Sequence, residues 1–241
     1  MGKSFLDGLP FKKKESEMRQ NLKENIYFQL VVCVVGLFFC ACGIYMMIEA
    51  NIGLAPWDVF AMGLSYQTHM SYGTALIVIS IGVIAIDVLL KEKIGFGTLF
   101  DATLVGIFVD MLTAIDPLHT PDSVFGAVLM LVCGMFSIAI GQCIYMSSCQ
   151  GCGPRDTLLV ALGKRMKKLP IGTVCMILLC TVLILGLLLK GPIGIGTVIS
   201  TFGLGVCLQI VCRIVRFEPR DVEHKNMIES LQVMRGHTES L

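Results

Sequence analysis

The sequence contains the stretch Gly53-Leu54-Ala55-Pro56-Trp57-Asp58, and the same pattern, G-x-x-P-x-D, returns at Gly151-Cys152-Gly153-Pro154-Arg155-Asp156. Each copy follows a long apolar run and places helix-breaking residues and a carboxylate where that run must end or bend. The flanks repeat too: the matched segments are Ile44-Tyr45-Met46 with Ile144-Tyr145-Met146, Gly73-Thr74 with Gly172-Thr173, Ile94-Gly95-Phe96-Gly97-Thr98 with Ile193-Gly194-Ile195-Gly196-Thr197, and Gly106 with Gly205. The offset stays between 98 and 100 residues. The chain therefore predicts two tandem copies of one unit, roughly residues 27 to 115 and 124 to 215.

The composition indicates a protein of the lipid bilayer. Of the 241 residues, 55% are apolar and 15% are charged, and the mean hydropathy is +0.78, whereas a soluble domain has about 25% charged residues. A helix needs roughly 20 apolar residues to cross a hydrocarbon core of ~30 Å. Runs of this length cover residues 27 to 48, 72 to 90, 98 to 115, 124 to 146, 171 to 189 and 196 to 214. We therefore predict an all-α, polytopic membrane protein with six transmembrane helices, three in each copy.

The basic residues indicate how these spans are oriented. Lys and Arg occur before the first span, after the second, after the fourth and from the end of the sixth onward, and only Lys190 falls in a loop on the other side. Because basic residues concentrate in cytoplasmic loops, both termini are expected in the cytoplasm. Three spans is an odd number, so the second copy is predicted to be inverted relative to the first. The expected division is a cytoplasmic arm (1–25), repeat one (26–118), repeat two (119–216) and a cytoplasmic tail (217–241).

The two breaks predict short helices that do not cross the membrane. Pro56 suits the first turn of a helix, where its missing N–H is not needed, and Asp58 suits the positive end of the helix dipole. A helix is therefore expected over residues 56 to 68, either re-entrant or at the interface. A second short helix is expected after Pro154, ending at the cytoplasmic surface in the basic run at residues 163 to 168.

Broken helices form central sites in transporters with inverted repeats, because non-helical backbone survives in the bilayer only beside protein or a water-filled cavity. On this interpretation Asp58 and Asp156 bind a cation or a proton, and Arg155 pairs with a carboxylate or receives an anionic group. Alternatively, both carboxylates only cap their own helices and Arg155 stays at the cytoplasmic surface. The candidate substrate-binding residues are Glu49, Gly53, Pro56, Trp57, Asp58, Asp110, Gly151, Gly153, Pro154, Arg155 and Asp156.

Acidic residues within the spans are notable because an Asp at the middle of a span raises the free energy of membrane insertion by about 2.5 to 3.5 kcal/mol. Asp110 lies deep in the third span or towards its far end, and it belongs to the candidate set for that reason. Asp101 lies about one turn into the same span, but Ser200 replaces it in the second copy, so this charge is not part of the repeat. Asp87, next to the charged residues 91 to 93, is expected to join an interfacial charge cluster.

Other motifs do not predict a chemical site. The glycine pairs in the I-G-x-G-T segments lack the preceding strand and the G-K-[ST] continuation of a phosphate-binding loop, and we expect them to serve close packing. The C-x-x-C at residues 149 to 152 lacks further metal ligands and a βαβ context, and the four histidines are scattered. No nucleophile and base stand at helical spacing. We therefore expect no metal, no cofactor, no nucleic-acid partner and no enzymatic activity.

The break motifs carry a resemblance to a known family. G-x-x-P-W-D after a first membrane helix, G-x-G-P-R-D after a fourth, and the two I-G-x-G-T segments resemble the YczE/YyaS/YitT-like family of bacterial integral membrane proteins. The resemblance covers residues 27 to 216. It implies a small multi-helix protein of a bacterial inner membrane, and it implies no particular substrate.

Two functions from different classes are compatible with the sequence. The first is a secondary transporter or permease for a small solute or ion, with both breaks converging on a site between the repeats. The second is a non-transporting membrane scaffold or regulatory protein, which recruits a partner or an anionic membrane lipid through its basic cytoplasmic face. Six helices are few for enclosing a pathway, so a homodimer is an expectation of the first hypothesis.

Overall fold

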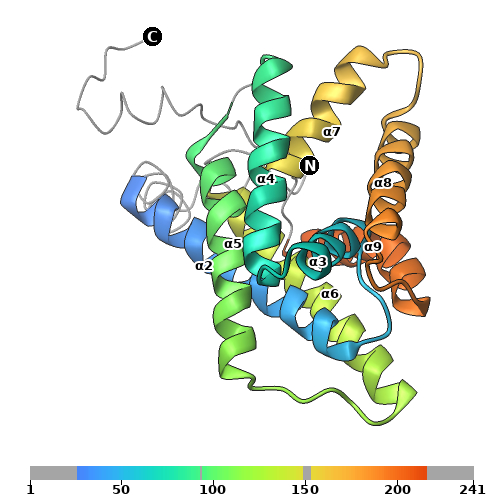
Figure 1. Cartoon of the computed structure of the whole chain (residues 1–241). Coiled ribbons are helices and arrows are strands. Elements are labelled where there is room, and N and C mark those ends of the chain that lie inside the picture. The colour runs from blue at the N-terminus through green and yellow to red at the C-terminus, as the bar shows by residue number, and fades with distance from the viewer. Residues whose placement is uncertain (1–25, 93, 149–152, 216–241) are drawn as a thin grey trace, which may run out of the picture.

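The computed structural model describes residues 26–92, 94–148 and 153–215, and this part of the chain is all-helical (Figure 1). Its long helices are α2 (Ile26–Ala50), α4 (Tyr72–Leu89), α5 (Phe96–Ile115), α6 (Val124–Ser147), α8 (Ile171–Leu188) and α9 (Ile195–Val215). Two short helices, α3 (Pro56–Thr68) and α7 (Pro154–Arg165), follow the breaks. Within the described residues, six helices are long and apolar enough to cross a membrane. The predicted all-α architecture with six spans is therefore confirmed, while the N-terminal arm, the C-terminal tail and the C-x-x-C lie outside the described residues.

The short helices begin where the prolines require it. Pro56 and Pro154 occupy the first turns of α3 and α7, and each helix has an aspartate in that turn. The bounds of α3 coincide with the helix predicted over residues 56 to 68. Gly53, in the loop before α3, has a φ of 112°, which a residue with a side chain rarely adopts. A Cβ at Gly53 would also lie 2.6 Å from the backbone nitrogen of Gly194, so this loop packs directly against the start of α9.

The centre of the molecule is the pair formed by α2 and α6. A Cβ at Gly36 would lie 2.8 Å from the carbonyl oxygen of Gly141, and one at Gly43 would lie 2.5 Å from that of Gly134. Residues later in α2 thus meet residues earlier in α6, so the two helices are antiparallel. Small residues allow such close approach of membrane helices. Around this pair, α5 packs on α2 and α9 packs on α6, while α3 packs on α8 and α7 on α4.

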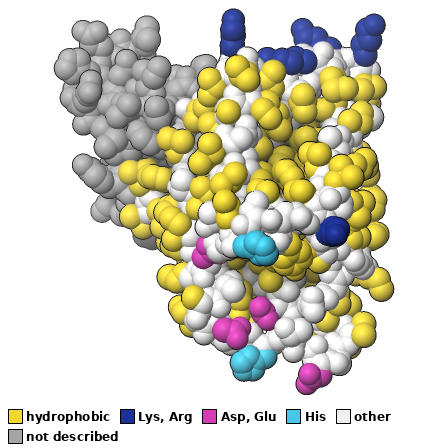
Figure 2. Space-filling view, viewed as in Figure 1, with side chains coloured by type: hydrophobic (Ala, Val, Ile, Leu, Met, Phe, Trp, Pro, Cys, Tyr) yellow, Lys and Arg dark blue, Asp and Glu magenta, His cyan; other side chains and the backbone are white. Residues whose placement is uncertain are grey.

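The two ends of the helical assembly differ in charge. On the face shown in Figure 2, Lys and Arg side chains gather at one end, and acidic and histidine side chains lie towards the other. At the basic end, Lys164 of α7 pairs with Glu92 after α4 at 2.6 Å, and Arg165 lies 3.7 Å from the same carboxylate. These ion pairs fix the end of α7 to the end of α4.

Asp87 differs from the sequence-based expectation. Its side chain is fully buried, and neither carboxylate oxygen has a hydrogen-bond partner in the described part of the chain. Glu92 is instead turned towards α7, where it pairs with Lys164 and Arg165. The expected interfacial cluster around Asp87 is therefore wrong, because the acidic side chain that meets the basic residues is Glu92.

The third and fourth helices of each copy pack differently in the two copies. In the first copy, α4 and α5 are in contact: a Cβ at Gly106 would lie 2.5 Å from the carbonyl oxygen of Gly73. In the second copy the matching glycines are Gly172 of α8 and Gly205 of α9, and a Cβ at either would meet nothing within 4 Å. Helices α4 and α5 thus pack against each other in the first copy, whereas the matching glycines of α8 and α9 do not meet in the second copy.

Candidate functional site

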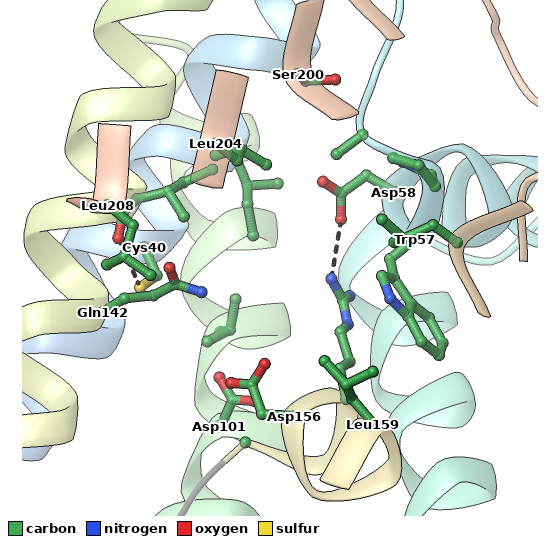
Figure 3. Close-up of a pocket in the computed structure, with 18 of the residues that line it drawn as sticks. Cys40, Trp57, Asp58, Asp101, Gln142, Asp156, Leu159, Ser200, Leu204 and Leu208 are labelled. Carbon is green, nitrogen blue, oxygen red and sulfur yellow. Dashed lines mark hydrogen bonds and ion pairs between the residues drawn. The ribbon is translucent and has the colours of Figure 1, made fainter. Parts of the chain in front are cut away.

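A cavity of about 420 Å³ lies between the two copies, with side chains from both contributing to its wall (Figure 3). The first turns of α3 and α7 supply three of its charged residues, α5 supplies the fourth, Asp101, and the long helices supply most of its apolar surface. Many lining residues stand at matching positions of the repeat; these pairs are Ala55 with Gly153, Pro56 with Pro154 (only Pro56 lines the cavity), Trp57 with Arg155, Asp58 with Asp156, Leu76 with Cys175, Asp101 with Ser200, and Val105 with Leu204. The two breaks therefore converge on one cavity.

Asp58 is held by partners from two other helices. Its side chain is almost completely buried, and its Oδ1 accepts a hydrogen bond from the Tyr72 hydroxyl at 2.9 Å. Arg155, from the second copy, places Nη1 3.5 Å from the same oxygen, and its guanidinium lies 5.2 Å from the centre of the Trp57 ring. Arg155 thus pairs with a carboxylate, which was one of the two roles considered for it. Asp58 meets Tyr72 and Arg155, and no backbone N–H of α3 donates to it among the described residues.

The other two carboxylates of the cavity belong to Asp101 and Asp156. A Cβ at Gly153 would lie 2.8 Å from Oδ2 of Asp101 and 3.8 Å from Oδ2 of Asp156, so both oxygens lie close to the same point. Figure 3 shows the two carboxylates next to each other, on the opposite side of the cavity from Leu204. Asp156 is exposed to the cavity. Desolvation by the surrounding protein raises the pKa of the Asp156 carboxyl group, and the positive charge of Arg155 opposes that shift.

The rest of the wall is mainly aliphatic, with a few neutral polar groups. Ser80 of α4 and Ser200 of α9 are buried and line the cavity, as does the half-buried Gln142 of α6. The aliphatic side chains that line it include Leu76, Val105, Leu178, Leu179, Leu204 and Leu208. Ligand sites commonly combine a mostly apolar wall with a few polar groups in volumes of about 300 to 1,000 Å³. By size and composition, this cavity falls within the range of such small-molecule sites.

The candidate residues from the sequence fall into two groups. Those that line the cavity are Pro56, Trp57, Asp58, Gly153, Arg155 and Asp156. Gly53 and Pro154 position the adjoining backbone without lining the cavity, and Gly151 lies outside the described residues. Glu49 and Asp110 also lie outside the cavity.

The positions of Glu49 and Asp110 have local explanations. Glu49 accepts a hydrogen bond from the Thr120 hydroxyl at 3.1 Å, which joins the end of α2 to the loop between the two copies. Asp110 accepts a hydrogen bond from the backbone nitrogen of Gly73 at 2.7 Å and another from the Ser71 hydroxyl, so it satisfies donors at the start of α4. Both carboxylates therefore satisfy donors on neighbouring segments and do not line the cavity.

Sequence reasoning missed several polar residues of the cavity. Asp101 was set aside because Ser200 replaces it, yet both residues line the cavity. Gln142 and Ser80 lie in apolar runs, and an isolated polar residue in such a run was the available signal. Among the described residues, no group of three or more His, Cys, Asp or Glu side chains is arranged to hold a metal ion.

Comparisons with known proteins agree with the architecture. Residues 27–213 match the model of DUF6198, described as a family of unknown function. An uncharacterized protein of Haemophilus influenzae is 29% identical over 189 residues, which is 78% of this chain and 85% of the relative. Two Bacillus subtilis proteins, the uncharacterized membrane protein YczE and the uncharacterized protein YyaS, are each 26% identical, over 78% and 75% of this chain and 87% and 90% of their own lengths. No solved structure matches the chain significantly. The chain is thus an integral membrane protein that belongs to the DUF6198 family and has YczE and YyaS among its relatives.

Proposed function

We propose that the protein is a secondary transporter for a small solute, which binds in the cavity between the two copies. The main supporting observation is a difference between the two copies. Gly73 and Gly106 bring α4 and α5 into backbone contact, whereas Gly172 of α8 and Gly205 of α9 face open space. In a transporter with inverted repeats, each copy can adopt the conformation that the other copy shows. The packed helix pair of the first copy and the separated helix pair of the second copy are then the closed and open states of one gate.

The position of the cavity supports this mechanism. Gly205 itself lines the cavity, together with Cys175 and Leu179 of α8. The cavity thus reaches the space between α8 and α9, whereas close packing of α4 on α5 closes the matching space in the first copy. In the other state of the gate, here called the exchanged state, the two copies have exchanged conformations. Helix α8 then packs on α9 through Gly172 and Gly205, and α4 separates from α5.

The distribution of basic residues indicates which side of the membrane the open helix pair faces. Gly172 begins α8 shortly after the basic segment that contains Lys164 and Arg165, and Gly73 begins α4 at the other end of the molecule. With basic residues on the cytoplasmic side, the open pair faces the cytoplasm and the closed pair faces outward. The structure then corresponds to an inward-facing state, with both termini in the cytoplasm.

The scaffold hypothesis has less support from the geometry. Two of the basic residues that would recruit a partner, Lys164 and Arg165, already pair with Glu92. The cavity wall carries three carboxylates and a guanidinium. Charged groups within a membrane protein are costly, and a scaffold has no need for them or for a cavity.

Cross-linking tests the exchange of the gate. In a background whose eleven native cysteines are replaced by alanine, the pair Gly172→Cys and Gly205→Cys should form a disulfide when membranes are treated with a mild oxidant. The expectation follows because the exchanged state brings these positions as close together as Gly73 and Gly106 are in the structure. Gel mobility before and after reduction measures the cross-link.

The matched control is the pair Gly82→Cys and Gly205→Cys, since Gly82 also has open space around it but lies in the other copy. This pair should remain at the background level. If the Gly172 and Gly205 pair does not exceed that background, the two-state gate is wrong and the proposed transport mechanism is withdrawn.

A further inference from the structure

We infer that the cavity takes a small organic cation, whose ammonium group lies between Asp101 and Asp156 and whose apolar part lies against the aliphatic wall. This inference names the substrate class of the proposed transporter and rests on that function for its biological meaning. The binding event can be measured separately from any transport.

The first argument is the balance of charge in the cavity. Four charged side chains line it, namely Asp58, Asp101, Arg155 and Asp156. Arg155 pairs with Asp58 at 3.5 Å and lies 5.2 Å from the centre of the Trp57 ring. Asp101 and Asp156 have no Lys, Arg or His within ion-pair distance in the described part of the chain. The cavity therefore has two carboxylates in excess and no unpaired cation to receive an anion.

The second argument is a polar side chain at the cavity wall that has no hydrogen-bond partner among the described residues. Ser80 is 5% exposed and lines the cavity, and its hydroxyl has no hydrogen-bond partner among the described residues. This hydroxyl is open to the cavity, so it can form a hydrogen bond with a molecule that enters. The Gln142 amide also projects into this space and offers an acceptor oxygen (Figure 3). An ammonium ion with several N–H donors can satisfy such acceptors together with the two carboxylates.

The third argument separates an organic cation from a metal ion. Mg²⁺ and Ca²⁺ require about six or more oxygen ligands, and the described residues contain no cluster of metal-ligating side chains. The wall is instead dominated by aliphatic side chains from several helices, among them Leu76, Leu178 and Leu208. A hydrated metal ion gains nothing from this surface, whereas an alkyl chain gains free energy by leaving water. A short alkylammonium ion matches both parts of the cavity.

The protein contains its own reporter for this test. Trp57 is the single tryptophan of the chain and lines the cavity, so its fluorescence reports on the site alone. We would titrate the purified full-length protein with n-butylammonium, and separately with 1-butanol and butyrate as neutral and anionic four-carbon compounds. A saturable change of Trp57 fluorescence is expected with n-butylammonium at concentrations where the other two compounds give none.

Two variants locate the ammonium group. Asp101→Asn and Asp156→Asn should each raise the dissociation constant for n-butylammonium at least tenfold, because each removes one of the excess charges. Glu49→Gln removes a carboxylate that lies outside the cavity and should leave the constant within about twofold of the wild-type value. Circular dichroism confirms that each variant is folded before titration.

The outcomes separate this inference from the transport mechanism. Preferential binding of butyrate or butanol, no saturable binding of any of the three, or equal affinity in the Asp variants and Glu49→Gln would each overturn the organic-cation site. None of these results bears on the cross-link between positions 172 and 205. Failure of that cross-link with intact butylammonium binding would instead leave a cation-binding membrane protein without the proposed gate.

Discussion

Replacing Gly106 with leucine should sharply lower the yield of folded protein, whereas the same replacement at Gly205 should leave the thermal unfolding temperature nearly unchanged. The two positions match in the repeat, but a Cβ at Gly106 would lie 2.5 Å from the carbonyl oxygen of Gly73 and 2.8 Å from Cγ1 of Ile77. Backbone cannot move aside as a flexible side chain can, so α4 and α5 would have to separate. Overpacking of this kind costs about 3 kcal/mol or more. A Cβ at Gly205 meets nothing within 4 Å.

Thermal unfolding of the detergent-purified variants, with size-exclusion chromatography for the folded yield, measures this difference. Gly82→Leu is the control for adding a leucine at an unpacked helical glycine, because that position also has open space around it. Equal damage from Gly106→Leu and Gly205→Leu would mean that α8 and α9 are packed together in the membrane. The asymmetry on which the gate depends would then be absent.

Replacing Arg155 with leucine should lower the free energy of unfolding by about 3 kcal/mol, and adding Asp58→Asn should recover most of that loss. Asp58 is 3% exposed, and Arg155 is the only cation that pairs with it in the described residues. Removing one partner of a buried ion pair leaves an uncompensated charge, and the penalty for that charge exceeds the net value of the pair. An asparagine at position 58 carries no charge and can still accept the hydrogen bond from Tyr72.

A double-mutant cycle with chemical or thermal unfolding as the readout measures this coupling. The single variant Asp58→Asn completes the cycle and shows the cost of leaving Arg155 without its carboxylate. If the double variant is as unstable as the sum of both single variants, the two side chains are not coupled. Arg155 would then stabilise the structure through its contact with Trp57 alone.

Features that depend on neighbours along the chain could be predicted from the sequence. The six spans follow from the length of apolar runs, and α3 follows from Pro56 and Asp58, because both signals are local. The repeat also placed Asp58 and Asp156 at corresponding breaks. It could not show that Arg155 of one copy pairs with Asp58 of the other, since that contact depends on how the copies pack.

The errors have a common physical origin. Glu49 and Asp110 were assigned to the site for lying at a break or within a span, but each satisfies donors on a neighbouring segment. Asp101 was set aside because it does not repeat. Matching positions of the two copies reach the cavity from different helices and therefore need not carry the same side chain. The charge of Asp101 faces Asp156, whereas Ser200 lies elsewhere on the wall (Figure 3).

The backbone hydrogen bond between the first break and α9 limits how the molecule can move. The nitrogen of Gly196 donates to the carbonyl oxygen of Ile52 at 2.7 Å, and Gly53 and Gly194 pack backbone against backbone beside it. These contacts join the start of α9 to the loop that leads into α3. We therefore expect a change in the angle of α9 to displace its opposite end more than this junction, and to be transmitted to the loop before Trp57.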